Sequence, residues 1–74
     1  MNITVKLVGM FCIGRFKKDV QEYPSGTKVV DVIEHLQLSR DVLGILLING
    51  VHAEEQEILK DGDTLSILPM LDGG

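Results

Sequence analysis

The chain ends on Gly73 and Gly74, and we expect Gly74 to carry a free α-carboxyl group. Such a group has an ordinary pKa of about 3.5, so at neutral pH it is an ionised nucleophile that needs no help from a side chain. Glycine has no Cβ, so the backbone of an enzyme can approach a diglycine stalk closely from either side. The alternative is an ordinary frayed terminus, because disorder and tolerance to sequence change concentrate at chain ends.

The other side chains with reactive groups favour structural roles. Cys12 lacks a nearby basic motif that would activate it as a persulfide relay, and buried free cysteine is common. His35 and His52 could share a metal ion, but exposure to solvent is the favoured interpretation. Asp61 and Asp63 resemble the start of a calcium loop without its downstream glutamate, so turn chemistry explains them. We therefore expect no metal site and no catalytic side chain.

Length and charge limit the classes of protein that fit. The chain has 74 residues and a net charge of -4, which suits one small folded domain, and its single cysteine excludes an internal disulfide. Residues 1–28 carry five basic side chains against two acidic ones, whereas residues 29–74 carry two against nine. This asymmetry can steer encounter with a partner of complementary potential. The N-terminus lacks the apolar run of a signal peptide or membrane span, so we expect a cytoplasmic protein without a membrane partner.

The basic cluster Arg15, Lys17 and Lys18 lies beside Phe16, as in some nucleic-acid patches. The chain as a whole is acidic and has no stacking motif, which disfavours nucleic acid as a partner. A solvated loop face is the favoured interpretation of this cluster.

The first half of the sequence predicts two strands and a helix. Ile3, Val5 and Leu7 alternate with polar residues, which is typical of a half-buried strand, and a second strand is predicted to end near Tyr23. Between them, residues 10–13 are expected to extend the first strand or form a turn. Apolar residues at helical spacing then predict a helix over residues 28–37, with Thr27 as its N-cap, held by packing against the sheet: Val29, Val32, Ile33 and Leu36.

The second half predicts three further strands. The run Ile45 to Ile48 meets Asn49-Gly50, which is the strongest short signal for a hairpin. An acidic connector containing about one helical turn follows, and a last strand is predicted over residues 64–69, ending at a proline that cannot donate to the ladder. Because successive side chains of a strand point to opposite faces of the sheet, two of the four apolar residues face the core. The other two face the opposite side and need something to cover them. That cover is either a partner protein or the loop over residues 10–16.

Three motifs accompany this order of elements: Asn49-Gly50, "LKDGDTLSILP" from Leu59 to Pro69, and the terminal diglycine. In the order of its elements and in these motifs, the chain resembles the prokaryotic sulfur-carrier family, usually written MoaD/ThiS. That family includes the molybdopterin-synthase small subunit and the thiamine sulfur carrier. The resemblance covers essentially the whole chain. It implies an α+β fold of the ubiquitin-like β-grasp type: a mixed sheet of four to five strands, one crossing helix, the order β-β-α-β-β-β, and a flexible C-terminal tail. The expected domain covers residues 1–69 and the tail residues 70–74.

The resemblance also implies a carrier and substrate rather than an enzyme. An E1-like activating enzyme uses ATP and magnesium to adenylate the Gly74 carboxylate, and a sulfur donor converts it to a thiocarboxylate. The carrier binds no cofactor itself and is expected to be a monomer when alone, with a large synthase subunit as a further partner. Length and the ending "PMLDGG" favour a pterin for molybdenum or tungsten as the sulfur acceptor over the thiazole of thiamine.

Residues near the tail are predicted to contact partners. Five extended residues reach roughly 17 Å at about 3.4 Å per residue, which suffices to enter a narrow channel. The side chains of Met70 and Leu71 are expected to anchor at its mouth, because tail contacts must offset the lost chain entropy. The predicted tail and interface residues are Met70, Leu71, Asp72, Gly73 and Gly74, with Phe11, Phe16 and Leu68 as a partner surface. For Phe11 and Phe16 the alternative is packing under the sheet, and the partner surface is the favoured interpretation.

Two other functions remain open from the sequence. One is a ubiquitin-like modifier that is joined to lysines of other proteins through Gly74, since both chemistries begin with an adenylated carboxylate. The other is a plain binding module whose tail has no role. The sequence also leaves open which activating enzyme serves the chain.

Overall fold

The computed structural model describes residues 1–70, and residues 71–74 lie outside the described part. Five strands, one α-helix and two short 3-10 helices follow in chain order. They are β1 (Asn2–Leu7), η1 (Gly9–Cys12), β2 (Lys18–Glu22), α1 (Val29–His35), η2 (Arg40–Val42), β3 (Leu43–Ile48), β4 (Val51–His52) and β5 (Thr64–Pro69).

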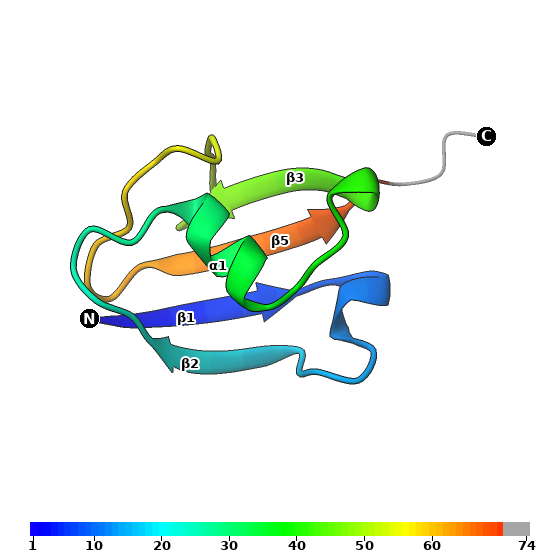
Figure 1. Cartoon of the computed structure of the whole chain (residues 1–74), viewed down its shortest axis with the longest axis horizontal. Coiled ribbons are helices and arrows are strands. Elements are labelled where there is room, and N and C mark those ends of the chain that lie inside the picture. Colours follow the sequence, from blue (N-terminus) through cyan, green and yellow to red (C-terminus); the bar gives the residue numbers. More distant parts are fainter. Residues whose placement is uncertain (71–74) are drawn as a thin grey trace.

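The five strands form one mixed sheet in the order β2-β1-β5-β3-β4. The central pair, β1 and β5, is parallel, and the other pairs are antiparallel. The helix α1 crosses one face of this sheet (Figure 1). This is the ubiquitin-like β-grasp, so the predicted fold class and element order are confirmed. Among residues 1–70, no helix has the length and apolar character needed to cross a membrane.

The hydrophobic core lies between α1 and the face of the sheet that α1 covers. It consists mainly of large aliphatic side chains, and burying each of them stabilises the fold by about 1.5–3 kcal/mol relative to exposure. The alternation predicted in β1 and β5 gives the inward-facing positions, and the helical spacing gives the inward face of α1. The fully buried residues are Ile3, Val5, Val29, Val32, Ile33, Leu65 and Ile67.

The helix is shorter at both ends than predicted, and its N-cap differs. Lys28, rather than Thr27, occupies the N-cap position. The Thr27 hydroxyl instead donates to the Pro24 carbonyl at 2.7 Å, inside the preceding turn. The Asp31 carboxylate accepts the Lys28 backbone N–H at 2.9 Å, which satisfies a donor that the first helical turn leaves unpaired.

The turns of the second half follow the sequence signals. Asn49 and Gly50 have φ of 53° and 80°, as a type I′ hairpin requires. Asp61 accepts the backbone N–H of Asn2 at 2.7 Å, and Asp63 accepts that of Lys60 at 2.8 Å. Asp63 therefore shapes its own turn, as expected, whereas Asp61 ties that turn to the start of β1. The acidic connector before them forms a turn, so the predicted helical turn there is wrong.

Arg15 ties the loop between β1 and β2 to the C-terminal end of α1. Its guanidinium donates to the carbonyl oxygens of Phe11, Leu36 and Gln37 at 3.1–3.2 Å. The last carbonyls of a helix lack partners within the helix, so Arg15 serves as a cap from a distant part of the chain. Arg15 is exposed, as the predicted solvated loop face implies, but it also has a specific structural role that the sequence did not indicate.

We expect Arg15→Ala to lower the free energy of unfolding by about 1–2 kcal/mol, because hydrogen bonds from a charged donor are lost at a partly exposed site. Urea denaturation followed by circular dichroism measures the change. Lys17→Ala is the matched control, since no side-chain hydrogen bond or ion pair of Lys17 is present among residues 1–70. Equal unfolding midpoints for the two variants would contradict this role of Arg15.

Candidate functional site

The chain end leaves the domain from β5, the central strand of the sheet. β5 pairs with β1 on one side and with β3 on the other, so the start of the tail is held on both sides. The hold extends one residue past the strand, because the Met70 backbone N–H donates to the Val42 carbonyl at 2.6 Å. η1 and η2 lie at this same end of the sheet (Figure 1). The predicted site residues Leu71, Asp72, Gly73 and Gly74 lie outside the described residues.

Two glycines flank Pro69 where the tail begins. A Cβ at Gly44 would lie 2.7 Å from Pro69 C, Pro69 O and Met70 N, so only glycine fits there without a backbone shift. On the other side, a Cβ at Gly9 would lie 3.2 Å from Pro69 Cγ, and Gly9 has a φ of +61°. The ladder between β3 and β5 shifts register between Leu43 and Ile45, at Gly44 itself. The close packing of backbone on backbone fixes the direction in which the chain leaves β5.

An apolar groove of about 480 Å³ opens at the same place. Ile45 pairs with Leu68 across β3 and β5, and both belong to the face of the sheet that α1 does not cover. Ile45 is 48% exposed, which is high for an isoleucine in a strand. Leu68, a predicted partner residue, thus lines a groove that also contains Met70. The lining residues are Val8, Gly9, Gly44, Ile45, Leu68, Pro69 and Met70.

The prediction of a partner surface at Phe11 is wrong. Phe11, in η1, is only 3% exposed and belongs to the core cluster, so it is not accessible to a partner. Phe16 is partly buried against the same cluster. The loop over residues 10–16 therefore packs its aromatic side chains on the α1 side and leaves Ile45 uncovered. The sequence left open whether this loop or a partner protein covers the outward-facing apolar residues of β3. For Ile45 the loop is excluded.

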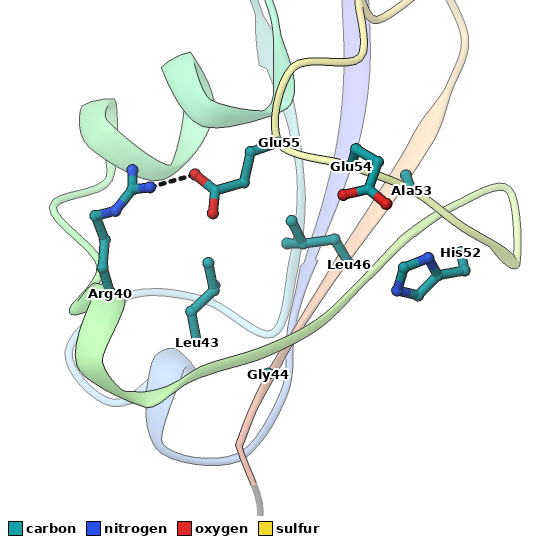
Figure 2. Close-up of a pocket in the computed structure, with 8 residues that line it drawn as sticks. All are labelled: Arg40, Leu43, Gly44, Leu46, His52, Ala53, Glu54 and Glu55. Atoms are coloured by element: carbon teal, nitrogen blue, oxygen red, sulfur yellow. Dashed lines mark hydrogen bonds and ion pairs between the residues drawn. The ribbon is translucent and has the colours of Figure 1, made fainter.

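A second, more polar hollow of about 300 Å³ lies beside β3, towards the segment that follows β4. Figure 2 shows Arg40 and Glu55 reaching toward each other across it, and the two side chains form an ion pair. His52 and Glu54 also line the hollow. Since Arg40 and Glu55 already satisfy each other, this hollow has a simple structural explanation.

Cys12 and His35 make local contacts. The Cys12 thiol donates to the Gly9 carbonyl at 3.1 Å, and His35 Nδ1 lies 3.2 Å from the Tyr23 hydroxyl. Burial of the Tyr23 ring raises the pKa of its hydroxyl above the ordinary value of 10.0. Within residues 1–70 no three histidine, cysteine or acidic side chains are placed to hold a metal ion.

Sequence reasoning missed the contribution of Gly44, Gly9, Val8 and Ile45 to this site. Gly44 carries a usable signal, because a glycine inside an apolar strand often marks close approach of another backbone. The strand was expected to begin at Ile45, which left Gly44 outside it. Val8 and Gly9 carry no local signal, since their role depends on β5 lying next to β1.

A family model described as the ThiS family matches residues 12–74, which is most of the chain. The chain belongs to the ThiS family. The matched region includes α1, β3, β5 and the terminal diglycine, so both the groove and the tail fall largely within it. The family relationship predicted from the sequence is thereby confirmed, at the level of small sulfur-carrier and ubiquitin-like proteins.

Solved structures resemble this ThiS-family chain over nearly its whole length. A protein from Pyrococcus furiosus, described as a candidate molybdopterin converting factor, subunit 1, is 25% identical with a TM-score of 0.77, covering 96% of this chain and 99% of its own. Small archaeal modifier protein 1 of Haloferax volcanii is 21% identical with a TM-score of 0.76, covering 95% and 98%.

The structure of a complex of subunits 1 and 2 of molybdopterin-converting factor from Helicobacter pylori also matches. The identity is 21% and the TM-score 0.68, with full coverage of both chains. A search of curated protein sequences gave no significant match. The likenesses at 21% identity show the fold of this ThiS-family protein.

Proposed function

We propose that this chain is a sulfur carrier whose Gly74 carboxylate is adenylated by a partner enzyme and converted to a thiocarboxylate. The thiocarboxylate then donates sulfur in cofactor biosynthesis, with a molybdenum or tungsten pterin favoured over thiamine. One observation carries the proposal: the sequence ends in a diglycine shortly after the central strand of a β-grasp domain, and the end of that strand lines an apolar groove.

The chemistry requires only the terminal carboxylate from this chain. A carboxylate oxygen attacks the α-phosphorus of ATP, pyrophosphate leaves, and a mixed anhydride with AMP forms. A hydrosulfide equivalent from a sulfur donor then displaces AMP, which leaves a thiocarboxylate. Magnesium and ATP belong to the activating enzyme, so the chain acts as its substrate rather than as an enzyme. This division of labour is consistent with the structural contacts that Cys12 and His35 make.

The groove supplies the binding energy that a short tail lacks. Ordering five backbone residues costs on the order of 5–10 kcal/mol, with glycine at the high end. Contacts made only by the tail would have to offset this cost inside the partner's active site. Apolar side chains buried in a central pocket are the usual source of binding energy at protein interfaces. The groove at Ile45, Leu68 and Met70 lies where the tail starts, so docking there delivers the tail to the reaction centre.

The pterin pathway is favoured by the comparison with the P. furiosus protein, described as a molybdopterin converting factor subunit, at 25% identity. The H. pylori complex of subunits 1 and 2 supports a large synthase subunit as a second partner. Such a partner would bind the same tail and groove as the activating enzyme. The two partners would therefore bind in turn rather than together.

The second candidate function is protein modification through Gly74. The likeness to small archaeal modifier protein 1, with a TM-score of 0.76, favours it. Conjugation and sulfur carriage share the adenylated carboxylate and differ only in the acceptor. An amine of another protein attacks in the first, and a sulfur nucleophile in the second.

Intact-mass analysis of the protein purified from its own cells without a C-terminal tag separates these functions. Exchange of one carboxylate oxygen for sulfur supports carriage. Conjugates of higher mass that persist after denaturation would support protein modification instead of sulfur carriage. A chain that stays unchanged after incubation with its activating enzyme, ATP, magnesium and a sulfur donor would overturn both.

We expect Ile45→Asp to raise the KM of the activating enzyme for this chain about tenfold while changing kcat little. A charge placed in the groove loses on the order of 1–2 kcal/mol of docking energy, but the tail that reacts is unaltered. Ile45 is already half exposed, so the fold should persist. Steady-state pyrophosphate release measures both constants. Val51→Asp is the matched control, because Val51 is 68% exposed and lies in β4, outside the groove. Equal KM values for the two variants would rule out docking through the groove.

A further inference from the structure

Two lysines face each other on the open side of the sheet. Lys6 of β1 pairs directly with Lys18 of β2 in the antiparallel ladder, and both are exposed. Directly opposed residues share one face of a sheet. Lys6 stands between the buried Val5 and Leu7, so this face is the one that α1 leaves open. The lysine pair and the apolar groove therefore belong to the same surface.

The pair lies close to the groove along two strands. Lys6 of β1 precedes the groove residue Val8, which directly follows the end of that strand, by two positions. Across the central ladder Lys6 pairs with Ser66, and Leu68 follows Ser66 by two positions on the same face of β5. The surface thus consists of an apolar groove with a basic margin on its β1–β2 side.

No acidic side chain in residues 1–70 pairs with either lysine. The ion pair of that part of the chain joins Arg40 of η2 to Glu55, which follows β4, and involves neither lysine. Asp19 stands on the opposite face of β2, where the Gln21 amide donates to its carboxylate at 2.7 Å. Glu22 is four residues from Lys18, about 13 Å along a strand. Like charges directly opposite each other destabilise a sheet. No group in residues 1–70 offsets the repulsion between these two lysines.

Two other cations of the basic N-terminal region, Arg15 and Lys28, already have partners. Arg15 donates to three carbonyl oxygens, and Lys28 Nζ donates to Gln56 Oε1 at 3.3 Å. The rest of the chain is strongly acidic, with nine acidic against two basic side chains in residues 29–74. A partner surface rich in carboxylates is consequently repelled by most of this molecule and attracted at the Lys6–Lys18 margin.

We propose that Lys6 and Lys18 are recognition residues for carboxylates on the activating enzyme, which flank the apolar side chains that enter the groove. This inference rests on the proposed function and adds the chemistry of the partner surface. The lysines orient the approach, so that the groove and the start of the tail meet the enzyme together. Charges at the rim of an interface act mainly on the association rate and its salt dependence.

The double variant Lys6→Gln/Lys18→Gln tests the proposal with the purified activating enzyme of the same organism. Stopped-flow measurements at low ionic strength should show an association rate about tenfold lower than that of the parent chain. The difference should vanish at about 1 M salt, where the Debye length falls to about 3 Å. The free variant should unfold at a higher urea concentration than the parent, because the repulsion between the lysines is gone.

These opposite effects on binding and stability separate recognition from a purely structural role. Lys60→Gln is the matched control, since Lys60 lies before β5, at the end of that strand away from the tail, and should change neither quantity. If the double variant is adenylated but associates as fast as the parent at low salt, the inference is wrong and the proposed function stands. If the parent chain itself is not adenylated, the proposed function fails and the inference with it.

Discussion

Deletion of Gly74 is expected to reduce adenylation of this chain by at least about 100-fold, with no change in its unfolding midpoint. The shortened chain still ends in a carboxylate, now on Gly73, but that group stops about 3.4 Å short of its position in the parent. Reacting atoms must come within about 3–3.5 Å in the correct orientation, and a displacement of 1 Å can cost 100-fold in rate. Pyrophosphate release under saturating ATP and activating enzyme measures the loss.

Asp72→Ala is the control for the deletion, because it alters the tail and keeps the carboxylate at its original reach. We expect the rate for Asp72→Ala to stay within about tenfold of the parent, since only a side chain is lost. If the deletion and Asp72→Ala react at the same rate, then reach does not govern the reaction.

Gly44→Ala is expected to disturb both the fold and the delivery of the tail. The added Cβ would meet backbone atoms of Pro69 and Met70 at 2.7 Å, and backbone cannot move aside as a flexible side chain can. Overpacking of this kind costs about 1–3 kcal/mol in the free energy of unfolding. Relief of the clash must shift the end of β5, which redirects the tail. We therefore expect kcat/KM for adenylation to fall by about 10- to 100-fold, in the range expected for a displaced reacting group.

The effect on delivery is separated from the effect on stability by Gly62→Ala. Gly62 has a φ of +89° with no heavy atom near its would-be Cβ, and it lies in the turn before β5, at the end away from the tail. Alanine there costs about 1–2 kcal/mol through backbone strain alone. Gly62→Ala should thus match Gly44→Ala in urea denaturation while keeping the activation rate of the parent. Equal activation rates for the two variants would show that Gly44 acts only through stability.

Local patterns in the sequence predicted most of the fold. The alternation of Ile3, Val5 and Leu7 gave β1, and Asn49-Gly50 gave the hairpin because a type I′ turn needs two positive φ angles. The helix was found from its apolar spacing. Its ends were less well predicted, since Gln37 takes a φ of 56° and stops the helix, and nothing local marks that residue.

The candidate site was only partly predictable because it is assembled by contacts distant in sequence. The diglycine and Leu68 could be recognised, but the groove forms only when β1 and β3 flank β5. Phe11 was assigned to a partner surface rather than to packing under the sheet, whereas η1 turns it into the core. Lys6 was visible as a polar position of a strand. Its opposition to Lys18 depends on the register of β1 and β2, which the sequence does not show.

The central claim is that the terminal carboxylate of Gly74 is the reactive group. Its most direct test compares the chain as a free acid with the same chain ending in a C-terminal amide, both made by semisynthesis, in ATP–pyrophosphate exchange with the activating enzyme. The two chains have the same length, so docking and reach are unchanged. We expect exchange with the free acid and none above background with the amide. Exchange at comparable rates with the amide would contradict the claim.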